Sequence, residues 1–227
     1  DSTVYCNQCS ACQQGLFNRC VKRQVLGVSV PEFKRDGAFA ELLAVPHWIC
    51  ARLPDNMSFV QASLLEPASI GTHAARRVPI TAGDTIVVLG AGTIGLFILQ
   101  AARLRSAGAV IASDINDFRL DLAKRVGADI CVNSHKADLK QEILKRTEGR
   151  GADVVFEAVG FGETFRQAVS VARAGGQIVA VGNLRKEIEI NLQELVSREL
   201  TFTGSYASSG EFRTCIGLIA SGQINVA

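Results

Sequence analysis

Four cysteines crowd into the first twenty residues and have the spacing of a metal site. Cys6, Cys9, Cys12 and Cys20 give the pattern C-x2-C-x2-C-x7-C. Four thiolates around one tetrahedral zinc ion, at about 2.3 Å each, make a closed structural site with no position left for water. The alternatives are an iron–sulfur cluster, whose usual cysteine runs have other spacings, and a pair of disulfides, which would need an oxidising compartment. The spacing favours zinc.

A glycine-rich segment in the middle of the chain has the types and spacing that bind a dinucleotide. An apolar run at 85–89 leads into Gly-Ala-Gly-Thr-Ile-Gly at 90–95, and an unbroken apolar stretch follows. This is the order strand, turn, helix, in which the first glycine allows a tight turn, the second lets the backbone approach a pyrophosphate, and the third lets helix and strand pack closely. The helix N-terminus would then face the phosphates. The candidate cofactor residues here are Gly90, Gly92, Thr93, Ile94 and Gly95.

An acidic residue follows this segment at the distance that such a unit needs. The apolar run 109–113 ends in Asp114, roughly 20 residues beyond the glycines, where the carboxylate binds a ribose 2′-hydroxyl. No arginine comes directly after Asp114, as an NADP site would want, so the sequence predicts NAD. Arg119 either flanks the adenine or is a solvated helix charge. A glycine-rich turn in some other α/β protein remains the alternative to a cofactor site.

Glu66 stands between two apolar segments, directly before Pro67. Ser58 and Gln61 form a capping box that starts a helix, and proline disfavours the helical conformation of the residue before it. The helix should therefore break at Glu66 and restart with Pro67 in its first turn. A carboxylate at such a kink either has a functional partner or caps the second segment, where negative charge is favoured.

The remaining chain repeats a strand–helix alternation. We expect strands at 129–132, 153–159, 177–181 and 200–203, and helices at 118–126, 137–147, 163–174 and 211–220. With the runs 85–89 and 109–113, this predicts a doubly wound parallel sheet of six strands with right-handed crossovers. Residues 36–45 instead predict a turn and a strand of a separate β-rich domain. We place a partial catalytic domain at 1–60 and a Rossmann domain at 61–227.

The composition excludes several classes of function. The 227 residues carry a net charge of +2, which gives no case for nucleic acid or an anionic membrane as a partner. The first residues lack the basic and apolar segments of a signal peptide, so none is predicted. Glycines interrupt the most hydrophobic stretch, 85–102, so no membrane span is predicted either. A soluble, cytoplasmic protein is expected.

Four segments together resemble the zinc-dependent medium-chain dehydrogenases, and the match covers essentially the whole chain. Besides the cysteine cluster, they are Asp-Gly-Ala-Phe-Ala-Glu at 36–41, Leu-Glu-Pro-Ala-Ser-Ile-Gly-Thr-His at 65–73, and the glycine motif at 90–95. The chain looks most similar to the polyol branch, with sorbitol, threonine and galactitol-phosphate dehydrogenases. The resemblance implies a GroES-like catalytic domain with a zinc lobe ahead of the Rossmann sheet.

The resemblance also implies roles for individual residues. The four lobe cysteines match structural zinc ligands, and Glu66 matches the acid that borders the catalytic zinc and its water. The positions that match dinucleotide-holding residues are Ile94, Asp114, Arg119, Val181 and Gly182. Ser205 and Tyr206 fall where the family closes over the nicotinamide.

The chain also departs from the family. Leu42 replaces an aromatic residue, and Ala207 stands where sorbitol-type members carry an arginine near the zinc, which argues against sorbitol itself as substrate. The cysteine and the Gly-His-Glu motif that hold the catalytic zinc, both upstream of the cysteine lobe in the family, do not occur in these residues. We therefore expect an internal part of a longer enzyme.

The leading functional hypothesis is an oxidoreductase that uses zinc and NAD and moves a hydride from a small alcohol or polyol. The alternative is a noncatalytic NAD-binding structural module of the same fold. A homo-oligomer, dimer or tetramer, is expected.

Overall fold

The computed structural model of the chain describes residues 1–226 and divides into two compact units. One contains residues 1–69 together with the segment from 207 onward, and the other contains residues 70–206. The domain boundary at residue 60 stays a prediction. No helix among the described residues is both long and apolar enough to cross a membrane.

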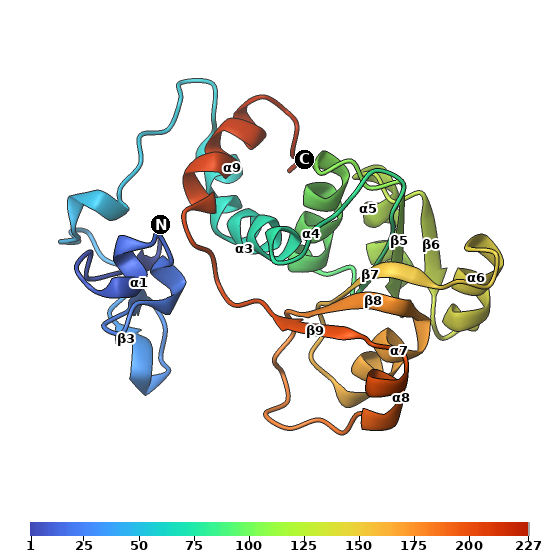
Figure 1. Cartoon of the computed structure of the whole chain (residues 1–227). Helices are drawn as coiled ribbons and strands as arrows, with labels where there is room; N and C mark the ends of the chain where they lie inside the picture. Colours follow the sequence, from blue (N-terminus) through green and yellow to red (C-terminus); the bar gives the residue numbers. More distant parts are fainter. Residues whose placement is uncertain (227) are drawn as a thin grey trace. The chain divides into compact units, whose positions relative to one another are not determined.

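The larger unit is built on a six-stranded parallel sheet, which confirms the predicted fold (Figure 1). The strand order is β6-β5-β4-β7-β8-β9, so the chain starts in the middle, runs to one edge, and returns to build the other half. The strands are β4 (Thr85–Leu89), β5 (Ala109–Asp114), β6 (Ile130–Asn133), β7 (Ala152–Glu157), β8 (Ala172–Ala180) and β9 (Thr201–Gly204). Because the order reverses between β4 and β7, a crevice opens there at the carboxyl ends of the strands.

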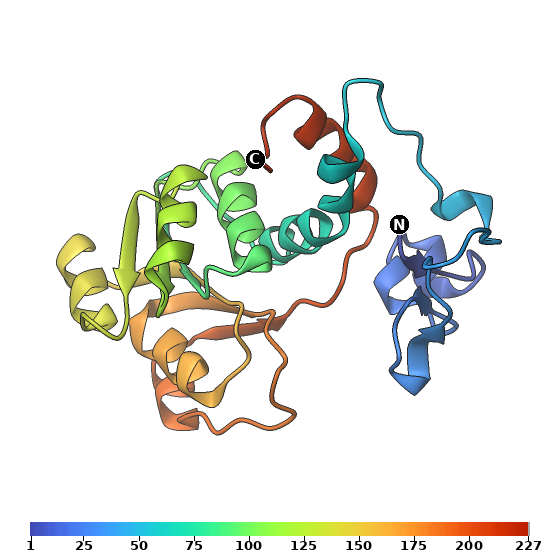
Figure 2. The same cartoon turned by 180° about the vertical axis from the view of Figure 1, so that it is seen from behind.

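Helices cover both faces of this sheet, as the two opposite views in Figures 1 and 2 show. One buried cluster joins a face of the sheet to α4 and α5 and contains Ile86, Ile98 and Leu120. A second cluster joins the other face to α6 and α7 and contains Val87, Ile143 and Val169. The alternation of Ile86 and Val87 between the two clusters follows from the period of two in a strand. The helices are α3 (Leu65–Arg76), α4 (Thr93–Leu104), α5 (Asp117–Arg125), α6 (Leu139–Arg146), α7 (Gly162–Val171) and α8 (Leu192–Ser197).

The smaller unit consists of short elements. Its three-stranded sheet has the order β1-β2-β3, with β1 (Thr3–Val4), β2 (Gln24–Leu26) and β3 (Lys34–Arg35). Its helices are α1 (Ser10–Gln13), α2 (Phe59–Ser63) and α9 (Glu211–Ala220), with 3-10 turns η1 (Phe17–Arg19), η2 (Pro31–Phe33) and η3 (His47–Ile49). The Ser58 side chain accepts a hydrogen bond from Gln61 N–H, and the Gln61 side chain accepts one from Ser58 N–H. These two bonds confirm the predicted capping box.

The prediction of a strand at 38–45 is wrong. These residues form bends and irregular backbone, and Phe39 and Leu42 are exposed. A strand exists only where a neighbour completes its hydrogen bonds, and no described segment pairs with this one. The apolar pattern therefore could not decide the structure alone.

Two helix predictions also shift. The break between α2 and α3 falls at Leu64, two residues before Glu66. Helix α3 can begin before Pro67 because the N–H groups of a first helical turn have no partner within the helix, so a proline there costs no hydrogen bond. Helix α7 ends at Val171, three residues early, since Ala172 already pairs with Ala152 as the start of β8. Helix α8 was not predicted.

An ion pair ties the amino-terminal ends of the central strands together. The Asp153 carboxylate accepts from Thr85 N–H at 2.8 Å and from Arg173 Nε at 2.6 Å, and it is largely buried. Burial alone would raise the pKa of Asp153, but the bonds from Arg173 and Thr85 outweigh it and hold that pKa below its usual value. Asp153 thus joins β4, β7 and β8.

We expect Asp153→Asn to destabilise the larger unit by about 1–3 kcal/mol, because it weakens a charge-assisted hydrogen bond in a partly buried site. Since the folded-state pKa is depressed, this contribution is present above the unfolded-state pKa and is lost as the pH falls through the folded value. Urea unfolding of wild type and variant at neutral pH and at acid pH measures both effects. Equal stabilities at neutral pH would contradict the account. The matched control is Asp121→Asn, a carboxylate on α5.

Candidate functional site

The glycine motif forms the turn between β4 and α4. Gly90 has a φ of 94°, a conformation that favours glycine, and a Cβ on Gly95 would lie 1.8 Å from Gly90 O. Gly92 precedes the first residue of α4, no side chain caps that helix, and a Cβ on Gly92 would meet nothing within 4 Å. The turn therefore packs tightly on one side and leaves the helix N-terminus open on the other.

Asp114 fastens this turn from the end of the neighbouring strand β5. Its carboxylate is buried, and Oδ2 accepts from Ala91 N–H at 2.8 Å. Oδ1 accepts from Asn116 N–H at 2.9 Å, and Arg119 Nη1 lies 3.6 Å from Oδ2. Each carboxylate oxygen can accept a further hydrogen bond. Asp114 therefore holds the turn in place while it keeps capacity for a ligand hydroxyl.

Glu157 plays a similar part at the end of β7, although it is fully buried. Its Oε1 accepts from Val159 N–H at 3.0 Å, Gly160 N–H at 2.8 Å and Thr164 Oγ1 at 2.7 Å. Its main-chain oxygen accepts from the N–H groups of the first two residues after β8, each at 2.9 Å. The Oε2 atom is buried without a partner among the described residues. One side chain and its own carbonyl thus fix the loops after β7 and β8.

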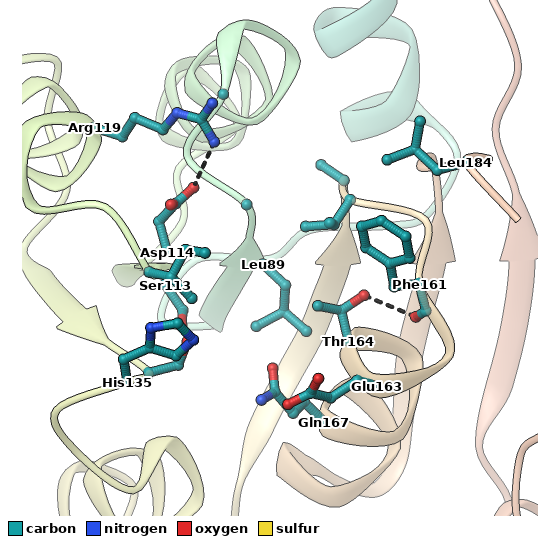
Figure 3. A pocket seen from close by; sticks show the side chains of 16 residues that line it. Leu89, Ser113, Asp114, Arg119, His135, Phe161, Glu163, Thr164, Gln167 and Leu184 are labelled. Carbon is teal, nitrogen blue, oxygen red and sulfur yellow. Dashed lines mark hydrogen bonds and ion pairs between the residues drawn. The ribbon is translucent and has the colours of Figure 1, made fainter.

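A cavity of about 480 Å³ lies at this carboxyl edge of the sheet. Figure 3 shows Asp114, Arg119 and His135 on one side and Phe161, Thr164, Glu163 and Gln167 on the other. Leu89 lies between them at the end of the central strand. The cavity occupies the crevice where the strand order reverses, which is where ligands bind in doubly wound sheets.

The four cysteines of the lobe come together in the smaller unit. Their sulfur atoms all lie within 4.8 Å of one another, with Cys9 and Cys12 at 3.5 Å and Cys6 and Cys12 at 3.9 Å. Sulfur atoms bound tetrahedrally to one zinc ion at 2.3 Å lie about 3.8 Å apart. The cluster therefore fits a single zinc ion.

Backbone groups prepare two of these thiols for ionisation. A hydrogen bond from the backbone of Gln8 lowers the pKa of Cys6, and backbone hydrogen bonds, first from Cys12, lower the pKa of Cys9 to about 6. Burial raises the pKa of Cys12 to about 12. A buried thiol next to thiolates needs a cation to ionise, and zinc is a cation that takes thiolate ligands.

Comparison with known proteins identifies the family to which the chain belongs. The sequence profile of zinc-binding dehydrogenases matches residues 93–221, and that of the alcohol dehydrogenase GroES-like domain matches residues 1–55. The chain belongs to the zinc-binding dehydrogenase family. The expected resemblance and fold are thereby confirmed.

Among its relatives are polyol dehydrogenases. L-idonate 5-dehydrogenase of Vitis vinifera is 34% identical over 98% of this chain and 61% of its own length. Sorbitol dehydrogenase of Bacillus subtilis is 33% identical over 98% of this chain and 62% of its own length. The chain thus spans less than two thirds of these relatives.

A solved structure with the same fold carries a cofactor. The putative zinc-binding dehydrogenase from Sinorhizobium meliloti, bound to NADP, has a TM-score of 0.89 and 33% identity, and the match covers all of this chain and 66% of that one.

The predicted cofactor residues fall into four groups by their position in the fold. Gly90, Gly92, Asp114 and Arg119 line the cavity. Thr93, Ile94 and Gly95 form the first turn of α4 behind it. Val181 and Gly182 follow β8, where a Cβ on Gly182 would lie 2.2 Å from Gly160 N. Ser205 and Tyr206 follow β9, and Ser205 Oγ is buried without a partner among the described residues.

The sequence predicted four of the sixteen residues that line the cavity and missed the rest of its wall. The additional lining residues include Ile115, Ser134, His135, Phe161, Glu163, Thr164, Gln167 and Leu184. Ile115 and His135 could have been found, because each comes shortly after a predicted strand. The α7 residues carried no such signal, since only the packing of that helix decides which of its faces meets the cavity.

Glu66 lies in the first turn of α3, in the part of this helix before residue 70 that belongs to the smaller unit. Desolvation by the surrounding protein raises the pKa of its carboxyl, although the side chain keeps surface exposure. Among the described residues, the one group with three or more metal-ligating side chains is the cysteine cluster, so Glu66 belongs to no such group in this part of the chain.

We expect Cys9→Ser to lose zinc, because three thiolates and a hydroxyl bind the ion less tightly than four thiolates. Metal analysis after dialysis of protein purified under reducing conditions should find one zinc per wild-type chain and much less in the variant. Acidification should release the metal as the thiolates protonate. The control is Cys50→Ser, an exposed cysteine outside the cluster. Freshly reduced wild type that takes up no zinc, or that re-forms two disulfides instead, would contradict the assignment.

Proposed function

We propose that this chain is part of a zinc-dependent oxidoreductase that transfers a hydride from an alcohol or polyol to NAD. The observation that carries the proposal is the cavity at the strand edge, with an open helix N-terminus on one wall and a buried carboxylate on the next strand. That pairing suits a dinucleotide, whose pyrophosphate needs N–H donors and whose ribose needs an acceptor.

Each part of the cofactor has a place in this proposal. The open side of Gly92 and the first turn of α4 would receive the pyrophosphate. Asp114 would accept hydrogen bonds from the hydroxyls of the adenosine ribose, since both its oxygens retain lone pairs. The nicotinamide would lie toward Val181 and Gly182, and the buried hydroxyl of Ser205 would meet a hydrogen-bonding group there. Bound NAD supplies the hydride acceptor.

The charge of Asp114 favours NAD over NADP, although a relative at 33% identity has been crystallised with NADP. A 2′-phosphate on the adenosine ribose would approach a buried carboxylate, and like charges repel strongly in such surroundings. The Arg119 guanidinium lies 3.6 Å from the Asp114 carboxylate and would offset part of this repulsion. Because the Arg119 side chain is half exposed, solvent screens its attraction for the phosphate.

We therefore expect NAD to bind the chain at least about tenfold more tightly than NADP, which corresponds to ~1.4 kcal/mol. Asp114→Ala should bring the affinities for NAD and NADP closer together. The variant lacks both the charge that repels the 2′-phosphate of NADP and the acceptor for the ribose hydroxyl of NAD. Titration calorimetry with both dinucleotides measures the ratio. Equal affinities in the wild type would refute the role of Asp114. Asp121→Ala, on helix α5, serves as the control for loss of a carboxylate.

The substrate class rests on the relatives and on Glu66. L-idonate 5-dehydrogenase and sorbitol dehydrogenase both carry polyol-type substrates in their names. A catalytic zinc, held by three protein ligands, supplies Lewis acidity to an alcohol oxygen. Glu66, the carboxyl group of which has a pKa raised by desolvation, would border that site in the full protein and could take up or release a proton there.

We expect residues 1–227 to bind NAD but to oxidise no alcohol at an enzymatic rate, since Glu66 alone cannot hold a catalytic zinc and a closed four-sulfur site has no room for substrate. The test compares this chain with the full reading frame, each with zinc and NAD, on a panel of polyols. In the full protein, Glu66→Gln should lower kcat more than cofactor affinity. Zinc-dependent turnover by residues 1–227 at the rate of the full protein would show that a catalytic site lies within them.

A noncatalytic NAD-binding module is the second candidate function. It is favoured by one observation, that the described residues hold no second cluster of metal ligands. A full reading frame without further cysteine and histidine ligands would support it.

We also propose a homo-oligomer, either a dimer or a tetramer, in the cytoplasm. Strand β9 forms an edge of the sheet, and its Phe202 is 38% exposed, which makes this edge a candidate for self-association. A reducing compartment suits the thiolates of the lobe.

A further inference from the structure

Two polar side chains of helix α7 line the cavity and are not used by the function proposed so far. They are Glu163 and Gln167, which stand four residues apart and are therefore neighbours on one face of the helix. Figure 3 shows them close together, on the opposite side of the cavity from Asp114 and Arg119. Glu163 is exposed and Gln167 is half buried, so both are accessible to a ligand in the cavity.

The first turn of α7 is held firmly in place. Thr164, which follows Glu163, donates from Oγ1 to Glu157 Oε1 at 2.7 Å, and Glu157 is fully buried at the end of β7. The same carboxylate oxygen accepts the N–H groups of Val159 and Gly160. The helix face that carries Glu163 and Gln167 is therefore fixed relative to the central strands before any ligand binds.

The proposed cofactor pose brings the base to this face. With the pyrophosphate at Gly92 and the ribose at Asp114, the base must occupy the rest of the cavity. That space lies between the apolar side chains of Ile115, Val159 and Phe161, which suit the flat faces of a purine. The polar edge of the base then meets the polar part of the wall, to which Glu163 and Gln167 belong.

The donors and acceptors of these side chains match adenine. An ionised carboxylate only accepts hydrogen bonds, and an amide both donates and accepts. Adenine carries an amino donor at C6 beside the N1 acceptor, and glutamine pairs well with such a donor–acceptor edge. We propose that Glu163 and Gln167 read the 6-amino group of the adenine, so that the site selects adenine dinucleotides against hypoxanthine dinucleotides. This inference rests on the proposed NAD function.

Nicotinamide hypoxanthine dinucleotide is the direct probe, because it replaces the 6-amino group by a carbonyl and changes nothing else but the N1 proton. The carbonyl oxygen of hypoxanthine would face the carboxylate of Glu163. Both groups only accept hydrogen bonds, so they would repel each other. The Gln167 amide can rotate and offer its donor instead, so Glu163 is the main source of discrimination. We expect the wild-type chain to bind NAD about fivefold or more tightly than the hypoxanthine analogue.

The decisive variant is Glu163→Gln, whose amide can donate to the carbonyl of hypoxanthine. Titration calorimetry should show that this variant binds the hypoxanthine dinucleotide about threefold or more tightly than the wild type does. A gain in affinity cannot arise from misfolding. Glu142→Gln on α6, outside the cavity, is the matched control and should leave both affinities at the wild-type values.

Three other outcomes separate the inference from the function on which it rests. Equal affinity of the wild type for the two dinucleotides would overturn the inference and leave the NAD function standing. A wild-type preference that Glu163→Gln does not reduce would overturn the role of Glu163. Failure of the wild type to bind either dinucleotide would overturn the proposed function and this inference with it.

Discussion

Two buried carboxylates that accept backbone N–H groups hold the proposed cofactor site together. Asp114, at the end of β5, holds the glycine turn through Ala91 N–H. Glu157, at the end of β7, holds the loop that follows through Val159 and Gly160 N–H. Hydrogen bonds to charged groups contribute about 1.5–3 kcal/mol each, and a buried carboxylate without such donors would be strongly unfavourable. The loops therefore keep their shape because their backbone N–H groups supply the hydrogen bonds that these two buried carboxylates need.

The sheet explains why the two acids can act together. Strands β5, β4 and β7 are parallel neighbours, so their carboxyl ends lie at one edge and their loops share one crevice. Tight contacts reinforce this arrangement, as between Gly95 and Gly90 and between Gly182 and Gly160. Side chains at these glycines would push the loops apart. The cavity is thus largely formed before a ligand arrives, which lowers the cost of binding.

The sequence predicted the sheet well because its signals are local. The central strands are short apolar runs, and two glycines of the motif, Gly90 and Gly95, have positions that only glycine fills easily. Asp114 and the cysteine cluster were predicted from spacing alone. In the structure Asp114 lies beside the glycine turn, and the four sulfur atoms lie within 4.8 Å of one another. The role of Glu157 was invisible, since nothing in the sequence shows that a carboxylate will be surrounded by the N–H groups of its own loop.

Other failures have physical causes of the same kind. The segment 38–45 has the pattern of a strand but lacks a described partner, and strand formation depends on that partner. The wall formed by Glu163 and Gln167 depends on which face of α7 meets the sheet. Both are tertiary properties that a run of residue types does not encode by itself.

A crystal structure of the chain with bound NAD tests the central claim most directly. The account predicts that the adenosine ribose hydroxyls lie within hydrogen-bond distance of Asp114, with Ala91 N–H still on the same carboxylate and the pyrophosphate at the first turn of α4. A dinucleotide bound elsewhere, or an Asp114 that releases the glycine turn in order to bind it, would contradict the account.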